Sequence, residues 1–337
     1  MTDLKTSYMG LELKNPVIAG ASGLTAETDS IKQLEESGVA AVVVKSLFEE
    51  EIELERFKYE KDLDKNNYRH PEMITVHPHP AFAGPEEYLQ WLSRAREKVD
   101  IPLIGSLNAV RRETWLDYAV KIEQAGVDAI ECNLFSVPGD PGKDGAAIER
   151  EQVELAGELK KALSIPLSLK LSYFYANPLN IIQRLDKAGA DGLVLFNRIF
   201  EPDLDIDKME HIAPFNFSHE TDYRLPMRYA GLMEGNVKAD ICCSNGIFSG
   251  GTAAKMILAG ASAVQVVSAL FVNGHGHVET MISELSDWME KNGYGSPADF
   301  KGRMSKRHSN DPGAYTRAHY ARLLMNPRRV LQDSFSM

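Results

Sequence analysis

Short runs of apolar residues recur along the chain, each introduced by a small residue and a glycine. Four stretches share this pattern: "ESGVAAVVVKS" (36–46), "QAGVDAIECNL" (124–134), "KAGADGLVLFN" (187–197) and "LAGASAVQVVS", which ends at 268. A glycine directly after a helix supplies the left-handed cap conformation. A short Val-, Ile- and Leu-rich run is typical of a strand buried on both faces. The pattern therefore predicts a helix followed by a buried parallel strand, repeated.

Four further apolar runs complete the set: "NPVIAGAS" (15–22), "IPLIGSLN" (101–108), "IPLSLKLS" (165–172) and "ADICCSNG" (239–246). Apolar residues at three-to-four spacing predict helices at 26–37, 112–125, 149–163, 177–188 and 250–260. Eight parallel strands with intervening helices make a (β/α)8 TIM barrel. A doubly wound open sheet is the alternative, and the lack of a G-x-G-x-x-G turn favours the closed barrel.

We expect one barrel domain over the 337 residues, because no linker separates two units. The length beyond an ordinary barrel falls into three segments. They are an insertion after the second strand (47–100), an insertion after the sixth strand (198–238) and a mainly helical C-terminal tail (285–337).

The net charge of −11 argues against nucleic acid or an anionic membrane surface as the main partner. No stretch reaches 18 uninterrupted apolar residues, so no membrane span is expected. The three cysteines, Cys132, Cys242 and Cys243, lie in apolar runs without zinc-type spacing, which favours a reducing, cytoplasmic location. The histidines in "HPHP" (77–80) and "GHGH" (274–277) lack other ligands at metal spacing, so no metal site is predicted.

Chemistry in such barrels lies at the carboxyl ends of the strands. These ends carry lysines, amides, hydroxyls and glycines, namely Ala21, Ser22, Lys45, Ser46, Asn133, Lys170, Asn197, Ser244, Asn245, Gly246 and Ser268. Neither a carboxylate pair nor a histidine ends a strand, which excludes ordinary glycoside hydrolysis and a Ser-His-Asp triad.

The stretch "SNGIFSGGTAAKMILAGA" (244–261) predicts a phosphate site at a helix that begins at about Gly251. The alternative is that its glycines only make a tight turn. Lys45 and Lys170 end buried strands, where each cation needs a partner or must reach solvent along the rim. Two cations near a phosphate site favour a redox cofactor, because a positive group stabilises a reduced, anionic flavin.

These features together resemble the dihydroorotate dehydrogenase family of FMN-dependent barrels. The resemblance covers about residues 9–280 and is carried by "NPVIAGASGL", "VVVKS", "ECNLFSVPG", "LKLSYF", "LFN" and "CCSNGIFSGGTAAKMILAGASAVQVVSAL". The chain begins directly with the barrel, which is more similar to the soluble class than to the membrane-associated class.

The resemblance implies that dihydroorotate is oxidised to orotate, in pyrimidine biosynthesis, with FMN as the cofactor. It places Ser136 as the general base and Lys170 at the pyrimidine edge of the flavin. The implied cofactor residues are Ala21, Ser22, Lys45, Ser46, Asn133, Lys170, Asn197, Gly231, Ser244, Asn245, Gly246 and Ser268. The implied substrate residues are Asn67, Asn133, Asn197 and Arg198.

The sequence departs from the family pattern on the substrate side. The asparagine-rich stretch expected after the second strand is replaced by "DKNNYRHPEMITVHPHP" (64–80), where only Asn66 or Asn67 can substitute. Arg198 stands where a small hydroxyl residue is usual, and Asn245 replaces a glycine of the phosphate loop. Two alternatives therefore stay open: a flavin barrel acting on another small heterocycle or carboxylate, and a barrel that binds a phosphorylated ligand without redox chemistry. A homodimer is expected because oligomers are common in this fold.

Overall fold

The computed structural model of the chain describes residues 2–54, 84–135 and 140–325. Eight parallel strands form a closed barrel, because β4 pairs with both β3 and β6. They are β3 (Val17–Ala19), β4 (Ala41–Val43), β6 (Leu103–Asn108), β7 (Ala129–Leu134), β8 (Leu167–Leu171), β9 (Gly192–Leu195), β12 (Asp240–Ser244) and β13 (Ala263–Val266). The two-residue strand β5 (Leu47–Phe48) pairs with the far end of β6. The predicted (β/α)8 barrel is confirmed.

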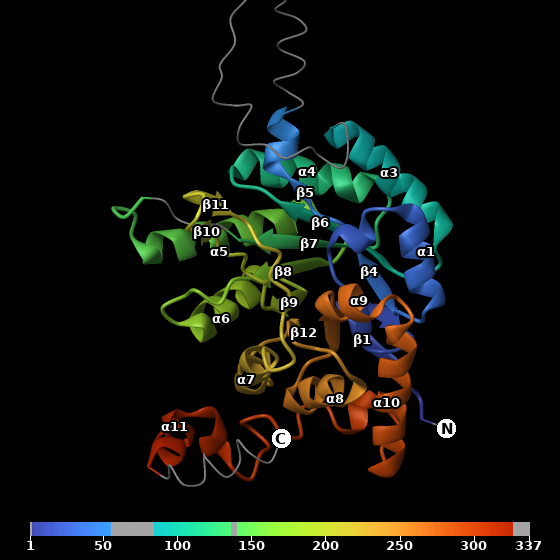
Figure 1. The fold of residues 1–337 in the computed structure, drawn as a ribbon, viewed down its shortest axis with the longest axis vertical. Coiled ribbons are helices and arrows are strands. Elements are labelled where there is room, and N and C mark those ends of the chain that lie inside the picture. Colours follow the sequence, from blue (N-terminus) through green and yellow to red (C-terminus); the bar gives the residue numbers. More distant parts are fainter. Residues whose placement is uncertain (1, 55–83, 136–139, 326–337) are drawn as a thin grey trace, which may run out of the picture.

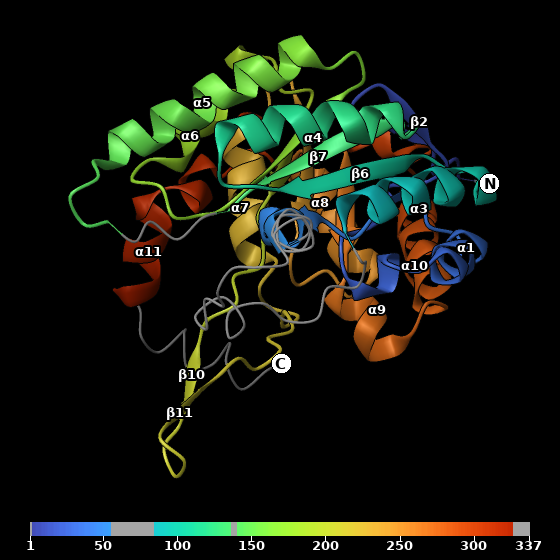
Figure 2. The same ribbon diagram turned by 90° about the horizontal axis from the view of Figure 1, so that it is seen from above.

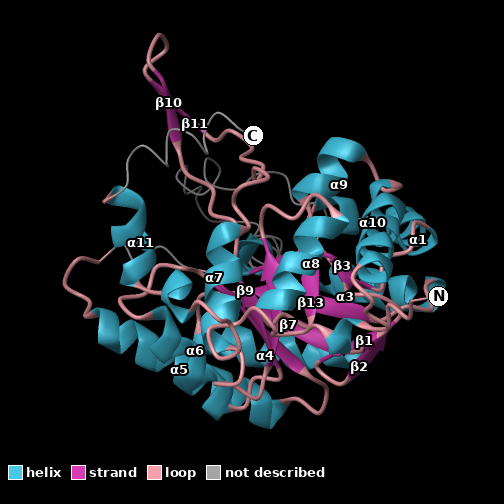
Figure 3. Cartoon of the chain, turned by 90° about the horizontal axis from the view of Figure 1, so that it is seen from below, coloured by secondary structure: helices cyan, strands magenta, loops and turns pink. Residues whose placement is uncertain are grey.

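Helices surround the barrel on its outer side (Figures 1 and 3). They are α1 (Thr28–Glu36), α3 (Pro85–Lys98), α4 (Arg112–Gln124), α5 (Gly145–Ala162), α6 (Pro178–Ala188), α7 (Arg224–Met233), α8 (Gly250–Ala259) and α10 (His277–Lys291). The short α9 (Ser268–Asn273) lies between β13 and α10. Helix α6 ends on Gly189 in the left-handed conformation, as the repeated glycine predicts.

Alternating strand residues divide the apolar core into two layers. Ile18, Val43, Ile104, Val194 and Cys242 pack together inside the barrel. Their strand neighbours face outward and pack beneath the helices in a second cluster, which includes Val17, Val42, Val264 and Cys243. Adjacent strand residues point to opposite faces. Cys242 and Cys243 are accordingly free, buried thiols on opposite sides of the sheet.

An N-terminal hairpin that the sequence pattern does not predict packs against the barrel interior. It consists of β1 (Thr6–Tyr8) and β2 (Leu11–Leu13). Tyr8 is fully buried, and a hydrogen bond of 2.9 Å joins its Oη to Ser168 Oγ. A Cβ atom on Gly192 would lie 2.7 Å from both Tyr8 Oη and Met9 Sδ, so only glycine permits this close approach.

The two predicted insertions each contain a regular barrel helix. Helix α3 lies within 47–100 and packs against α1 and α4, and α7 lies within 198–238 and packs against α6 and α8. The segment before α7 also carries the hairpin of β10 (Asp203–Asp205) and β11 (Glu210–Ile212), which projects away from the barrel (Figure 2).

The described part of the predicted C-terminal tail begins within α10. After α10 it holds two single-turn 3-10 segments (Pro297–Asp299 and Pro312–Tyr315) and the helix α11 (Arg317–Leu324). Among the described residues, no helix has the length and apolar character needed to cross a membrane.

Candidate active site

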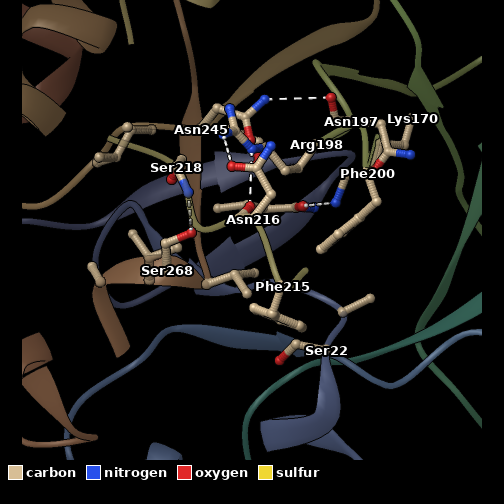
Figure 4. Close-up of a pocket in the computed structure, with 18 of the residues that line it drawn as sticks. Ser22, Lys170, Asn197, Arg198, Phe200, Phe215, Asn216, Ser218, Asn245 and Ser268 are labelled. Atoms are coloured by element: carbon tan, nitrogen blue, oxygen red, sulfur yellow. Dashed lines mark hydrogen bonds between the residues drawn. The ribbon is translucent and has the colours of Figure 1, made fainter. Parts of the chain in front are cut away.

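A cavity of about 230 Å³ opens where strands β8, β9, β12 and β13 end (Figure 4). Part of its wall comes from the segment between β9 and α7, which contributes Phe200, Phe215, Asn216 and Ser218. The predicted residues that line it are Ala21, Ser22, Lys170, Asn197, Arg198, Ser244, Asn245, Gly246 and Ser268. None of the described lining residues is acidic. The structure thus brings most of the predicted residues together around a site that suits a neutral or anionic ligand.

Lys170 supplies the buried cation of the cavity. Its side chain comes from β8 and is 6 % exposed. The Nζ atom donates a hydrogen bond of 2.9 Å to Oε1 of Gln265, which comes from β13 and also lines the cavity. An ammonium group has three N–H donors. Lys170 can therefore hold this bond and still offer a donor to a ligand.

Asn133 lies beside Lys170, opposite it in the register of β7 and β8. Its Oδ1 is buried and has no hydrogen-bond partner among the described residues. Buried polar side-chain atoms in folded proteins are nearly always hydrogen-bonded. The orphaned oxygen can accept a hydrogen bond from a donor that the described residues do not supply.

The glycine-rich turn after β12 faces the cavity with Gly246 and Ile247, while Ser268 and Ala269 face it from the start of α9. Ser268 Oγ accepts a hydrogen bond of 2.9 Å from the Ser218 N–H, so its own proton is available for donation.

The stretch 244–261, predicted to bind phosphate, includes the start of α8, where the N–H groups of Gly250 and Thr252 are hydrogen-bonded within the protein. The N–H of Gly250 donates at 2.7 Å to a carboxylate oxygen of Glu284, and Ser249 Oγ caps the N–H of Thr252. This helix start packs against α10 and does not line the cavity. Gly246 and Ile247 of the same stretch, and Ser268 and Ala269 after β13, do line the cavity, so the phosphate site stays a prediction.

Arg198 lines the cavity, but its guanidinium is held by the segment that precedes α7 (Figure 4). Nη1 forms an ion pair of 2.8 Å with Asp222. Nη2 donates to Oδ1 of Asn216 at 2.8 Å and to the carbonyl of Phe217 at 3.0 Å, and Nε donates to the carbonyl of Asn216 at 3.2 Å. The residue predicted to bind substrate thus joins the end of β9 to this segment.

Asn245 has a structural reason to replace glycine. Its φ of 80° lies in the left-handed region, which asparagine tolerates better than most side chains. Its amide Nδ2 donates to the carbonyls of Phe196 at 2.9 Å and Asn197 at 3.4 Å, which ties β12 to the end of β9.

Four predicted residues are absent from the cavity lining: Asn133, described above, and Lys45, Ser46 and Gly231. Lys45 forms an ion pair of 2.9 Å with Glu51, and Ser46 Oγ is hydrogen-bonded at 2.6 Å to Ser106 Oγ. Gly231 lies in α7, where an added Cβ would be 2.3 Å from the ring of Tyr315. Ser136 and Asn67 fall outside the described residues, so their predicted roles stay predictions.

Sequence reasoning missed Gln265, Ser218, Asn216 and the two phenylalanines of the wall. Gln265 could have been predicted, because it is the one polar residue inside the apolar run "AVQVV" (263–267). The others lie in an irregular segment, where no periodicity indicates which side chains face the cavity.

The cysteines are not candidates for nucleophilic chemistry. Burial raises the pKa of the Cys132, Cys242 and Cys243 thiols above the ordinary value. The thiolate is the reactive form, so all three stay protonated and unreactive at neutral pH. Among the described residues, no group of three or more His, Cys, Asp or Glu side chains is placed to hold a metal ion.

The family model described as dihydroorotate dehydrogenase matches residues 82–289. The chain belongs to this family. The dihydroorotate dehydrogenase B (NAD(+)) catalytic subunit of Methanocaldococcus jannaschii is 29 % identical over 308 residues, covering 86 % of this chain and 94 % of the relative. The subunit of the same name from Thermoplasma volcanium is 28 % identical over 321 residues, covering 91 % and 100 %. The chloroplastic dihydropyrimidine dehydrogenase (NADP(+)) of Arabidopsis thaliana is 24 % identical over 330 residues, covering 89 % and 76 %.

Proposed function

We propose that the protein is an FMN-dependent dehydrogenase that oxidises dihydroorotate to orotate in pyrimidine biosynthesis. One observation carries the proposal for a chain of this family. A buried ammonium, Lys170, lies beside the orphaned Asn133 oxygen, at the end of the barrel where a cavity without acidic lining opens.

The residues of the cavity fit the parts of FMN. Lys170 and Asn133 suit the polar pyrimidine edge of the flavin, and the small Ala21 leaves room for a flat ring. The Ser268 hydroxyl and the main chain at Gly246 suit the phosphate. A bound flavin supplies a hydride acceptor, which no protein side chain provides.

The remaining chemistry belongs to side chains of the chain itself. Oxidation of dihydroorotate removes a proton from C5 and a hydride from C6. We assign the proton to Ser136, on the position implied by the family resemblance. A hydroxyl is a weak base, so Ser136 needs a relay through water or a neighbouring group. The amides of Asn133 and Asn197 are assigned to hydrogen bonds with the substrate ring.

The test is an absorption spectrum of the pure protein before and after anaerobic addition of dihydroorotate. Flavin bands that bleach on addition support the proposal, and FMN released on denaturation identifies the cofactor. A colourless chain that takes up no added FMN refutes the proposal. The remaining hypothesis is then a barrel that binds a phosphorylated ligand without redox chemistry.

Ser136→Ala tests the assigned base. We expect this variant to keep its flavin and to reduce it at least about 100-fold more slowly, which is the effect of losing a general base. Single-turnover reduction at the wild-type rate would remove Ser136 from the mechanism.

A second candidate substrate is an uncharged dihydropyrimidine. Arg198, predicted to bind the substrate, is already paired with Asp222, and one relative is named dihydropyrimidine dehydrogenase. Anaerobic bleaching by dihydrouracil but not by dihydroorotate would select this candidate while keeping the cofactor assignment.

We also propose a second copy of the chain as a partner. The turn of the β10–β11 hairpin exposes Ile206 and Met209 by 83 % and 90 %, and exposed apolar side chains gathered on one projection favour burial in an interface. Light scattering tests this: Ile206→Ser with Met209→Ser should shift a dimeric mass toward that of the monomer. A monomeric wild-type mass would refute it.

A further inference from the structure

Three polar side chains that can carry a charge or a carboxamide, Glu131, Lys170 and Gln265, contact one another inside the barrel. Glu131 of β7 and Gln265 of β13 are each 1 % exposed, and Lys170 of β8 is 6 % exposed. Lys170 and Gln265 line the cavity, whereas Glu131 lies behind them and does not. Glu131 is therefore a buried charge that the chemistry proposed above does not use.

The contacts order the three groups into one network. Gln265 Nε2 donates to Oε2 of Glu131, and its Oε1 accepts from Lys170 Nζ at 2.9 Å. The other carboxylate oxygen of Glu131 lies 3.5 Å from Lys170 Nζ. A carboxamide carries both a donor and an acceptor, so Gln265 can bridge a carboxylate to an ammonium. A glutamate at this position would present only acceptors to Glu131.

The network has two physical consequences. Lys170 contacts Glu131 on the adjacent strand β7 and Gln265 on β13, which is separated from β8 by two strands in the sheet, and these contacts limit where its ammonium group can lie. The negative charge of Glu131 also offsets part of the positive charge that Lys170 presents to the cavity. Charges in a low-dielectric interior are only weakly screened, so this offset extends into the cavity.

We propose that Glu131 is a positioning residue that acts through Gln265 and Lys170 to set the reduction potential of the bound flavin. The inference rests on the proposed function. Two electrons and one proton convert oxidised flavin to its reduced anion, and the positive charge of Lys170 stabilises that anion. Glu131 reduces this stabilisation and keeps the flavin potential lower than Lys170 alone would set it.

The decisive variant is Glu131→Gln, which keeps the side-chain shape and removes the charge. We expect reduced flavin to bind about tenfold more tightly relative to oxidised flavin, which corresponds to a midpoint potential about 30 mV higher for a two-electron couple. The midpoint is measured by equilibration with a reference dye, and the affinity for oxidised FMN is measured by fluorescence titration of the apoprotein. Neither readout depends on turnover.

Two controls separate charge from packing. Glu131→Asp keeps the charge and should restore a midpoint near that of the wild type. Glu49→Gln removes another buried carboxylate, 4 % exposed, which directly follows β5 and accepts hydrogen bonds from the loop before α4. It should leave the midpoint unchanged because Glu49 does not line the cavity.

If Glu131→Gln does not fold, Lys170→Met is compared with the double variant Lys170→Met/Glu131→Gln. These variants leave no uncompensated ammonium in the interior, and the double variant should have the higher midpoint. A wild-type chain that takes up no FMN overturns the cofactor assignment and this inference together. A wild-type chain that binds FMN, with a Glu131→Gln midpoint equal to its own or a double variant equal to Lys170→Met, overturns the inference alone.

Discussion

Replacing Arg198 with methionine tests whether this residue holds the cavity wall or reads the substrate. The guanidinium makes one ion pair with Asp222 and three hydrogen bonds to Asn216 and Phe217. The ion pair is about 70 % buried on both sides, with 28 % and 29 % of the two side chains exposed. A hydrogen bond to a charged group contributes about 1.5–3 kcal/mol, and methionine keeps the apolar packing. We expect a net loss of about 2–4 kcal/mol in the stability of the segment before α7.

That segment contributes Phe200, Phe215 and Ser218 to the cavity, so its loosening should weaken cofactor binding. Each 1.4 kcal/mol corresponds to a tenfold change in affinity, and we expect the dissociation constant of FMN to rise about 10- to 100-fold. Fluorescence titration of the apoprotein measures the constant, and limited proteolysis reports cleavage between β9 and α7. Arg198→Lys should fall between wild type and Arg198→Met, because an ammonium cannot reproduce the planar fork of donors.

Arg184→Met is the matched control. Arg184 lies on α6, is 33 % exposed and pairs with Glu149 at 3.4 Å, but it does not line the cavity. Its loss should leave FMN affinity and the proteolysis pattern unchanged. The reasoning is refuted if Arg198→Met keeps both at wild-type values while the KM for dihydroorotate rises, because that result makes Arg198 a substrate-binding residue.

Two further predictions concern stability. Gly192→Ala places a Cβ 2.7 Å from the Tyr8 hydroxyl and should lower the free energy of unfolding, measured by urea denaturation, by about 1–3 kcal/mol. Gly145→Ala is the control, because no atom lies within 4 Å of the added Cβ, and it should leave the free energy of unfolding unchanged. Burial raises the pKa of the Glu49 carboxyl, but hydrogen bonds from Arg111 and from main-chain N–H groups before α4 outweigh burial and leave that pKa below its ordinary value. The stabilisation is therefore complete above the unfolded-state pKa of about 4.3 and is lost as pH falls through the lower folded-state pKa. Glu49→Gln should show a lower urea midpoint at pH 7 and a shallower decline toward pH 3, and parallel curves for the two proteins would contradict this account.

The barrel was predictable because its strands are buried on both faces. Such strands are continuous apolar runs, and for four of the eight a glycine after the preceding helix marks where the strand begins. Helices α3 and α7 were hidden because they lie inside long polar segments. The β1–β2 hairpin was missed because a three-residue strand is too short to show an alternating pattern.

The site was predictable only where it depends on strand register. Lys170, Asn197 and Ser244 follow from their place at or next to strand ends, and Glu131 was within reach because it shares a strand face with Asn133. The hydrogen-bond partners of Arg198 could not be predicted from the sequence. They are set by how a segment 18 to 24 residues further along folds back on the barrel, and no local pattern encodes that contact.

The groups assigned to the pyrimidine edge of the cofactor lie on strands, whereas the wall expected to select the substrate comes from the segment between β9 and α7. Lys170, Gln265 and Asn133 project from strands whose positions are fixed by the closed sheet, and the hydrogen bond from Lys170 to Gln265 joins two of these strands. The wall that faces them comes from the segment between β9 and α7, and the Arg198 guanidinium joins the end of β9 to that segment through Asn216, Phe217 and Asp222. A closed parallel sheet tolerates little change, whereas loops accept substitution and insertion. Changes of substrate within this architecture should therefore arise in the loop wall while the interior network stays constant, since altering the network changes the charge presented to every ligand in the cavity.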